Sequence, residues 1–192
     1  MIPPIFQYYD DILDNKQVKS IHDVLITEEI DWHMIQSTVI TYEPSVLIDP
    51  KVKEYIQFGH LARDSERALS QWIKVTDYVL DKFVEKTNIK IKTILRAKLN
   101  LLTRVESFPH DFYNIPHVNQ NFPHYVLLYY VNDSDHPTRI FSGQTPPYEV
   151  LAEIEPKAGR YLLFNGEYYH AGGHPNAHDT RLLINYDFTI NV

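Results

Sequence analysis

From residue 89 onward the sequence alternates apolar and polar residues with a period of two, and no other feature constrains the fold as strongly. Ile89, Ile91, Leu95, Ala97, Leu99 and Leu101 alternate with Lys90, Lys92, Arg96, Lys98 and Asn100. Such alternation is typical of a strand with one buried face. Short apolar runs follow at 125–131, 138–141, 160–164 and 181–190, separated by Pro, Gly, Asn and Asp. Many short strands behind leading helices predict a mainly β protein with flanking helices, a sandwich or a barrel.

Two helices are expected before this region. Asn15 is placed to cap a first helix, because the apolar residues that follow it recur at helical spacing. A second apolar stripe from Leu69 to Val84, with charges between, predicts a helix that Asn88 ends. No linker or repeat divides the chain. We therefore expect one domain over 1–192, with a helix-rich support at 1–88 and a barrel core at 89–192.

Composition excludes several classes of protein. The chain lacks cysteine, so it has no disulfide, thiolate zinc site, iron–sulfur cluster or cysteine nucleophile. Lys and Arg number 18 against 25 Asp and Glu, a net charge of −7 that makes a nucleic-acid partner unlikely. No apolar stretch is long enough to span a membrane, and no signal peptide is evident at the start. A soluble cytoplasmic protein is the expectation, and the sequence does not give its oligomeric state.

Ten histidines are present, and most are expected to be ordinary. His110, His117 and His124 each follow a proline at intervals of seven. The prolines exclude a shared helix, and an odd offset along an extended chain alternates faces. At most one of these three histidines is therefore expected in a site.

A second group, His170, His174 and His178, is spaced by four. Gly172 and Gly173 make a metal-binding helix improbable there. We expect His174 and His178 to be surface residues of a loop.

A longer-range combination carries the functional hypothesis. His117 and Asn119 precede the strand at 125–131, His170 follows the strand at 160–164, and Arg181 opens the last strand. Two histidines and one oxygen ligand leave three positions of a metal open, and a 2-oxo acid can take two of them. An arginine on a neighbouring strand is a suitable two-pronged partner for the far carboxylate of such an acid.

The chain resembles the iron(II)- and 2-oxoglutarate-dependent oxygenases, specifically the small prolyl 4-hydroxylase-like group of microbes and phages. The resemblance covers about residues 95–190 and rests on PHVN at 116–119, VLLYYVNDSD at 126–135, IEPKAGRYLLFNG at 154–166, YYHAGGHP at 168–175 and TRLLINYDF at 180–188. It implies a double-stranded β-helix, the jelly-roll barrel of that family. It also implies His117, Asn119 and His170 as Fe(II) ligands, with Arg181 and Tyr130 binding the 2-oxoglutarate co-substrate. The implied activity is a dioxygenase that hydroxylates an aliphatic C–H bond, with a prolyl residue of a peptide or protein, or a small molecule, as substrate.

One position departs from the family pattern. The family has His-x-Asp where this chain has His117, Val118 and Asn119. An asparagine offers a neutral carbonyl oxygen in place of a carboxylate, so it binds a cation more weakly. Asn119 is thus a weak but sufficient ligand, an inactivating substitution, or a position that leaves room for an added anion as in related halogenases, the least favoured of the three.

Two alternatives to the hydroxylase stay open. The first is a catalytically silent β-helix that binds a ligand, because Asn119 replaces the usual Asp. The second is a nucleic-acid repair oxygenase that uses the basic stripe of Lys90, Lys92, Arg96 and Lys98. We favour a solvated face for that stripe, since lysines on exposed strands discourage edge pairing.

Overall fold

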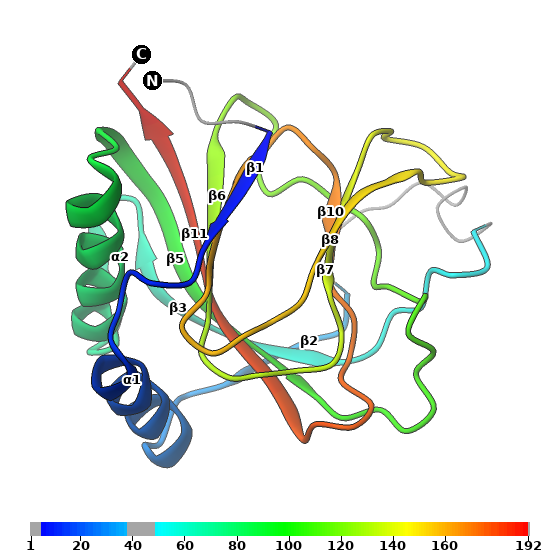
Figure 1. The fold of residues 1–192 in the computed structure, drawn as a ribbon, viewed down its shortest axis with the longest axis horizontal. Coiled ribbons are helices and arrows are strands. Elements are labelled where there is room, and N and C mark those ends of the chain that lie inside the picture. The colour runs from blue at the N-terminus through cyan, green and yellow to red at the C-terminus, as the bar shows by residue number, and fades with distance from the viewer. Residues whose placement is uncertain (1–4, 38–48, 192) are drawn as a thin grey trace.

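Two antiparallel sheets face each other, and two helices cover the outer face of the larger sheet (Figure 1). The structure is a computed structural model, and it describes residues 5–37 and 49–191. This arrangement confirms the predicted mainly β fold with helices that support one sheet. The larger sheet is open, since β1 and β2 form its two edges.

The larger sheet has eight strands and the smaller sheet three. In spatial order the larger sheet contains β1 (Phe6–Tyr9), β9 (Tyr161–Asn165), β6 (Tyr125–Tyr130), β11 (Thr180–Ile190), β5 (Ile91–Thr103), β3 (Gln57–Asp64) and β2 (His33–Ile35), and β4 (Arg67–Ala68) pairs with β3. The smaller sheet contains β10 (His170–Ala171), β7 (Thr138–Phe141) and β8 (Val150–Ile154). Strands β1 to β4 come from the first 88 residues, so this part of the chain extends the larger sheet as well as supplying helices.

The helices α1 (Asn15–Thr27) and α2 (Ile73–Thr87) lie where the sequence predicts them. Asp14 caps α1, one residue before the predicted Asn15, because its carboxylate accepts from two backbone N–H groups in a capping box with Gln17. Asn88 ends α2 in the left-handed region, with φ of 56°. No helix of the described ranges is both long and apolar enough to cross a membrane.

Tyrosines of the larger sheet hold α2 in place. The Tyr161 hydroxyl donates to the Val79 carbonyl at 3.0 Å, and the Tyr186 hydroxyl donates to the Thr76 carbonyl at 2.7 Å. Phe83 also stacks on Tyr161 with ring centroids 5.7 Å apart. Buried tyrosines that find such partners pack without leaving an unsatisfied hydroxyl. The helices therefore seal the outer face of the sheet and leave the inner face to the site.

A β-bulge near Leu95 interrupts the alternation of β5 without changing which face is polar. Arg96 pairs with Asp187 of β11, and Ile94 pairs with Phe188, so Leu95 has no partner there. The extra residue places Ile94 on the helix side, and a second register shift near the start of β5 restores the alternation. The polar face of β5, opposite the helices, lines the space between the two sheets rather than solvent. The expectation of one solvated basic stripe is therefore wrong for Arg96 and Lys98, which face inward, although Lys90 and Lys92 are exposed.

Candidate functional site

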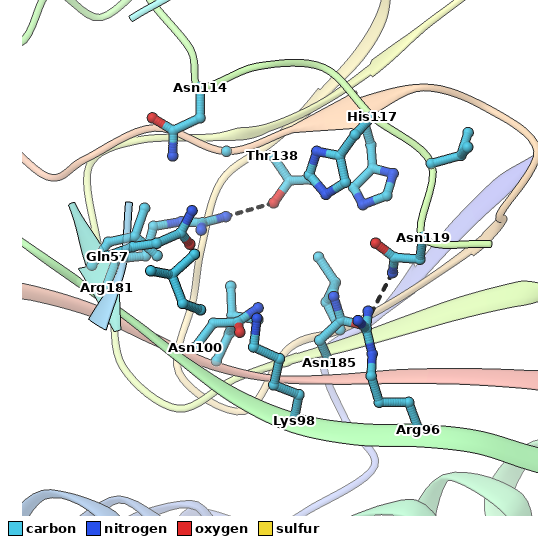
Figure 2. Close-up of a pocket in the computed structure, with 17 residues that line it drawn as sticks. Gln57, Arg96, Lys98, Asn100, Asn114, His117, Asn119, Thr138, Arg181 and Asn185 are labelled. Atoms are coloured by element: carbon cyan, nitrogen blue, oxygen red, sulfur yellow. Dashed lines mark hydrogen bonds between the residues drawn. The ribbon is translucent and has the colours of Figure 1, made fainter. Parts of the chain in front are cut away.

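A cavity of about 410 Å³ lies between the two sheets (Figure 2). Strands β5 and β11 form its floor, and β7, β10 and the loop at 114–119 cover it. Its lining residues are Ile35, Gln57, Arg96, Lys98, Asn100, Leu102, Asn114, His117, Val118, Asn119, Leu128, Thr138, His170, Gly172, Arg181, Leu183 and Asn185. Four of the five predicted site residues are therefore in one cavity, and the fifth, Tyr130, lies directly behind it.

His117 and His170 form a pair at the wall of this cavity. Their ring centroids are 4.7 Å apart, and their backbones exchange two hydrogen bonds of 3.1 and 3.0 Å. Burial lowers the pKa of both imidazoles, and the neighbouring His117 lowers that of His170 further. Both rings are therefore neutral at physiological pH, which is the form that binds metal ions.

The loop that carries His117 is fastened at several points. The Asn114 N–H donates to the Gly172 carbonyl at 2.8 Å, and the Ile115 N–H donates to the Glu54 carboxylate at 3.0 Å. The His117 Nδ1 lies 2.9 Å from the Ile115 carbonyl oxygen, so this nitrogen carries the proton. The Nε2 lone pair is thereby left for a ligand, and metal-binding histidines commonly donate their other ring N–H in this way.

Asn119 lies beside the histidine pair, and its amide nitrogen is hydrogen-bonded to two side chains of β11. Its Nδ2 donates to Asp187 Oδ1 at 2.7 Å and to Asn185 Oδ1 at 3.4 Å. The side-chain oxygen points into the cavity on the side of His117 (Figure 2). The side chain thus offers a carbonyl oxygen where the family pattern has a carboxylate.

Arg181 lies at the opposite end of the cavity with an unbalanced charge. The residue is 3% exposed, and its Nη2 donates to Thr138 Oγ1 at 2.7 Å. Among the described residues it has no carboxylate partner, and its Nε has no hydrogen-bond partner. A buried guanidinium without a counterion is costly, so this end of the cavity is suited to an anion.

Tyr130 completes this anion site. Its hydroxyl lies 2.6 Å from Thr138 Oγ1, and the Arg181 guanidinium lies 5.7 Å from its ring centroid. Thr138 therefore joins Tyr130 to Arg181 through one hydroxyl. Thr138 was not predicted from the sequence, since an isolated threonine in a short strand carries no signal of its own.

Further polar atoms of the lining are buried without partners in the described part of the chain. They are Gln57 Nε2, Arg96 Nε, Asn100 Oδ1, Asn114 Oδ1 and His170 Nδ1. Buried polar groups are normally satisfied, so unpartnered atoms around one cavity indicate a polar ligand or ordered water.

Two inward-facing cations add to the positive potential of the cavity. Arg96 pairs with the buried Asp187 at 2.9 Å, whereas Lys98 forms no ion pair with any described residue. Burial and the neighbouring Arg96 lower the pKa of Lys98 to about 8. The alternation in the sequence marks these residues as the polar face of the strand, but it does not show that a second sheet covers that face.

The other histidines lie apart from this pair. His110 is exposed, and His124 is buried with its Nδ1 bonded to the Phe122 carbonyl. His178 is exposed and contacts Asp135, as expected. The expectation of a surface position is wrong for His174, which is fully buried because the loop folds back and its Nδ1 bonds to the Thr103 carbonyl.

Solved structures share the fold of this chain at low sequence identity. A 2OG-Fe(II) oxygenase family oxidoreductase from Burkholderia pseudomallei has a TM-score of 0.65 at 11% identity, with 96% of this chain and 85% of that chain covered. A prolyl hydroxylase from Trichoplax adhaerens, in complex with a hypoxia inducible factor peptide fragment, has a TM-score of 0.62 at 15% identity, with 97% and 84% covered. The epimerase SnoN from nogalamycin biosynthesis, in complex with Fe3+, α-ketoglutarate and nogalamycin RO, has a TM-score of 0.58 at 11% identity, with 97% and 79% covered.

No protein-family model and no curated protein matches the sequence. The structural likeness nevertheless confirms the jelly-roll fold of the 2-oxoglutarate oxygenases that the sequence resemblance implied.

Proposed function

We propose that this chain is an Fe(II)- and 2-oxoglutarate-dependent dioxygenase that hydroxylates an aliphatic C–H bond. One observation carries the proposal: a histidine pair lies in the same cavity as a buried arginine that has no counterion among the described residues. The first group suits a metal and the second suits a carboxylate. A fold alone would not support this activity, because one fold hosts many functions.

The residues present fit an iron ion. His117 and His170 offer neutral imidazoles, and Asn119 offers an oxygen on the same side of the cavity. Two nitrogen ligands and one oxygen ligand on one side leave open positions for a co-substrate and dioxygen. The His117 Nδ1 proton, donated to a backbone carbonyl, fixes the ring for this role.

The residues at the other end fit 2-oxoglutarate. Arg181 would bind its far carboxylate through the guanidinium, and Thr138 and Tyr130 orient that guanidinium from below. The unpaired Lys98 adds a positive charge to the same cavity, which favours a dianion over a neutral molecule. The bound metal and co-substrate supply the oxidising chemistry. The chain would bind the two at opposite ends of the same cavity and so hold them next to each other.

For the substrate we propose a prolyl residue of a peptide or protein. The prolyl hydroxylase of similar fold, solved with a peptide fragment, supports this class. The epimerase of similar fold acts in nogalamycin biosynthesis, so a small molecule is the alternative substrate.

A ligand-binding module without catalysis is the second candidate function. One observation favours it: Asn119 brings no negative charge to the metal. An uncompensated cation between two neutral imidazoles is held less strongly than one that also binds a carboxylate.

The test of the proposed function is metal content together with conversion of 2-oxoglutarate to succinate in the absence of substrate. Wild type should retain iron and form succinate, and His170→Ala should lose both. His178→Ala is the matched control, since His178 is exposed and contacts only Asp135. If wild type and His170→Ala retain equal iron and neither forms succinate, the dioxygenase proposal is rejected.

A further inference from the structure

Asp187 is a buried carboxylate for which the proposed function assigns no role. It is 0% exposed and lies on β11 two residues beyond Asn185, on the face that carries Arg181. Its Oδ1 accepts from Asn119 Nδ2 at 2.7 Å. Its Oδ2 contacts Arg96 Nη2 at 2.9 Å and accepts from Gln120 Nε2 at 3.3 Å.

These contacts decide which atom of Asn119 faces the cavity. A carboxylate only accepts hydrogen bonds, so the amide must turn its nitrogen toward Asp187. Its second N–H is directed at Asn185 Oδ1. Both amide protons are thereby directed below the cavity, and the oxygen is left to point toward His117 (Figure 2). Without Asp187 the amide could rotate and present its nitrogen, which cannot bind a cation.

We propose that Asp187 is a positioning residue of the metal site, which holds Asn119 so that its side-chain oxygen is the third ligand. The inference rests on the proposed function and deepens it. In the family pattern the third ligand is itself a carboxylate. In this chain the carboxylate, that of Asp187, would instead be hydrogen-bonded to the ligand Asn119. An accepting carboxylate also polarises the amide and makes its oxygen a better ligand.

Arg96 determines how much of the contribution of Asp187 to metal binding comes from its negative charge. Its guanidinium neutralises part of the Asp187 carboxylate, so the long-range attraction for a cation is reduced. The orientation of the amide does not depend on that net charge. We therefore expect the contribution of Asp187 to be mainly geometric.

The same geometry explains why an asparagine suits position 119. An aspartate there would face Asp187 at hydrogen-bonding distance with no proton donor between the two carboxylates. Such a pair repels and would distort the site. Asn119→Asp alone is thus expected not to restore an ordinary ligand set.

The experiment is an exchange of the two side chains. Wild type, Asn119→Asp, Asp187→Asn and the double variant Asn119→Asp/Asp187→Asn are compared for binding of Mn(II) with 2-oxoglutarate present, by electron paramagnetic resonance of the free ion. Asp187→Asn should weaken binding by about tenfold or more, as is usual for the support of a metal ligand. Asn119→Asp should not tighten it. The double variant should bind at least as tightly as wild type, because the amide introduced at position 187 would then donate to the carboxylate introduced at position 119 and accept from Arg96.

If Asp187 had only a structural role, the double variant would not recover the Mn(II) affinity of wild type. Recovery of that affinity therefore supports the positioning role. Wild-type affinity in Asp187→Asn, or a double variant no tighter than Asp187→Asn, would overturn the inference. If Asp187→Asn does not fold, the comparison of Asn119→Asp with the double variant still decides, since the inference requires the double variant to bind more tightly.

Two controls separate this inference from the proposed function. Gln120→Leu removes the other amide donor to Asp187 without touching Asn119, and should leave Mn(II) affinity unchanged. His170→Ala should abolish binding. If His170→Ala binds as well as wild type, the proposed metal site itself fails. If His170→Ala loses binding while Asp187→Asn keeps it, only the role of Asp187 fails.

Discussion

Arg181 occupies the space that a side chain on Gly172 would need. A Cβ at Gly172 would lie 2.8 Å from Arg181 Nη1, closer than real Cβ contacts allow. The Arg181 guanidinium therefore passes close to the backbone of Gly172 on its way to the cavity. Only glycine leaves room for it at this position.

Gly172→Ala is accordingly expected to displace Arg181 and weaken 2-oxoglutarate binding. Isothermal titration calorimetry with Mn(II) present should show a loss of about tenfold or more, since the displaced guanidinium loses its paired geometry. Gly143→Ala is the control, because the nearest atom to a Cβ there is 3.8 Å away. Equal affinity in the two variants would mean that the guanidinium does not bind the co-substrate.

Arg181→Lys tests the guanidinium itself. Lysine keeps the charge but has no planar fork, so 2-oxoglutarate affinity should fall by about tenfold or more while the fold is retained. Arg104→Lys is the matched change at an exposed ion pair with Asp179 and should have no effect. An unchanged affinity of Arg181→Lys in the same titration would assign Arg181 a purely structural role.

The free energy of unfolding depends on pH through the ionisation of Lys98. Its pKa is about 8 in the folded chain and 10.5 as its ordinary value. Between these values the unfolded chain binds more protons, so this residue makes stability rise with pH across that window. Below pH 8 the buried charge costs up to about 3 kcal/mol.

Lys98→Met should therefore raise the melting temperature at pH 7, by about 2 °C or more for a chain of this length. The gain should shrink as the pH approaches 10. Lys92→Met, at an exposed position of the same strand, should change little. A constant gain from pH 7 to 10 would mean that Lys98 titrates normally.

Binding of single-stranded DNA should be weak at physiological salt. Of the four basic residues of the stripe, Lys90 and Lys92 are exposed, while Arg96 and Lys98 face the cavity. Fluorescence anisotropy at about 50 and 200 mM salt should show no steep loss of affinity, because few phosphates are neutralised. Tight, salt-sensitive binding that Lys90→Gln/Lys92→Gln weakens would instead favour the nucleic-acid repair alternative.

Local patterns predicted most of the elements that meet in this site. The period of two located β5, and the last strand was expected at 181–190. Alternation along that strand places Arg181, Leu183 and Asn185 on one face, and all three line the cavity. The sequence resemblance brought out His117 and His170, because a shared motif carries information on long-range pairing that periodicity lacks.

What was missed depends on tertiary pairing. The alternation places Arg96 and Lys98 on the polar face of β5, but only the packing of the two sheets shows that this face lines a cavity rather than meeting solvent. Asp187 continues the inward face of β11 and could have been found by extending that alternation by one step. Its contact with Asn119 joins residues 68 positions apart, which no local pattern reveals.

The backbone bridge between His117 and His170 has a consequence for the proposed metal site when no ion is bound. Two reciprocal hydrogen bonds hold the two chain segments together whether or not an ion is bound between the rings. Treatment with a chelator should therefore leave the protein folded, with a preformed site that binds metal again without refolding. A metal ion bound there would occupy a site that the fold has already formed, unlike the ion of a zinc finger, which holds the domain together.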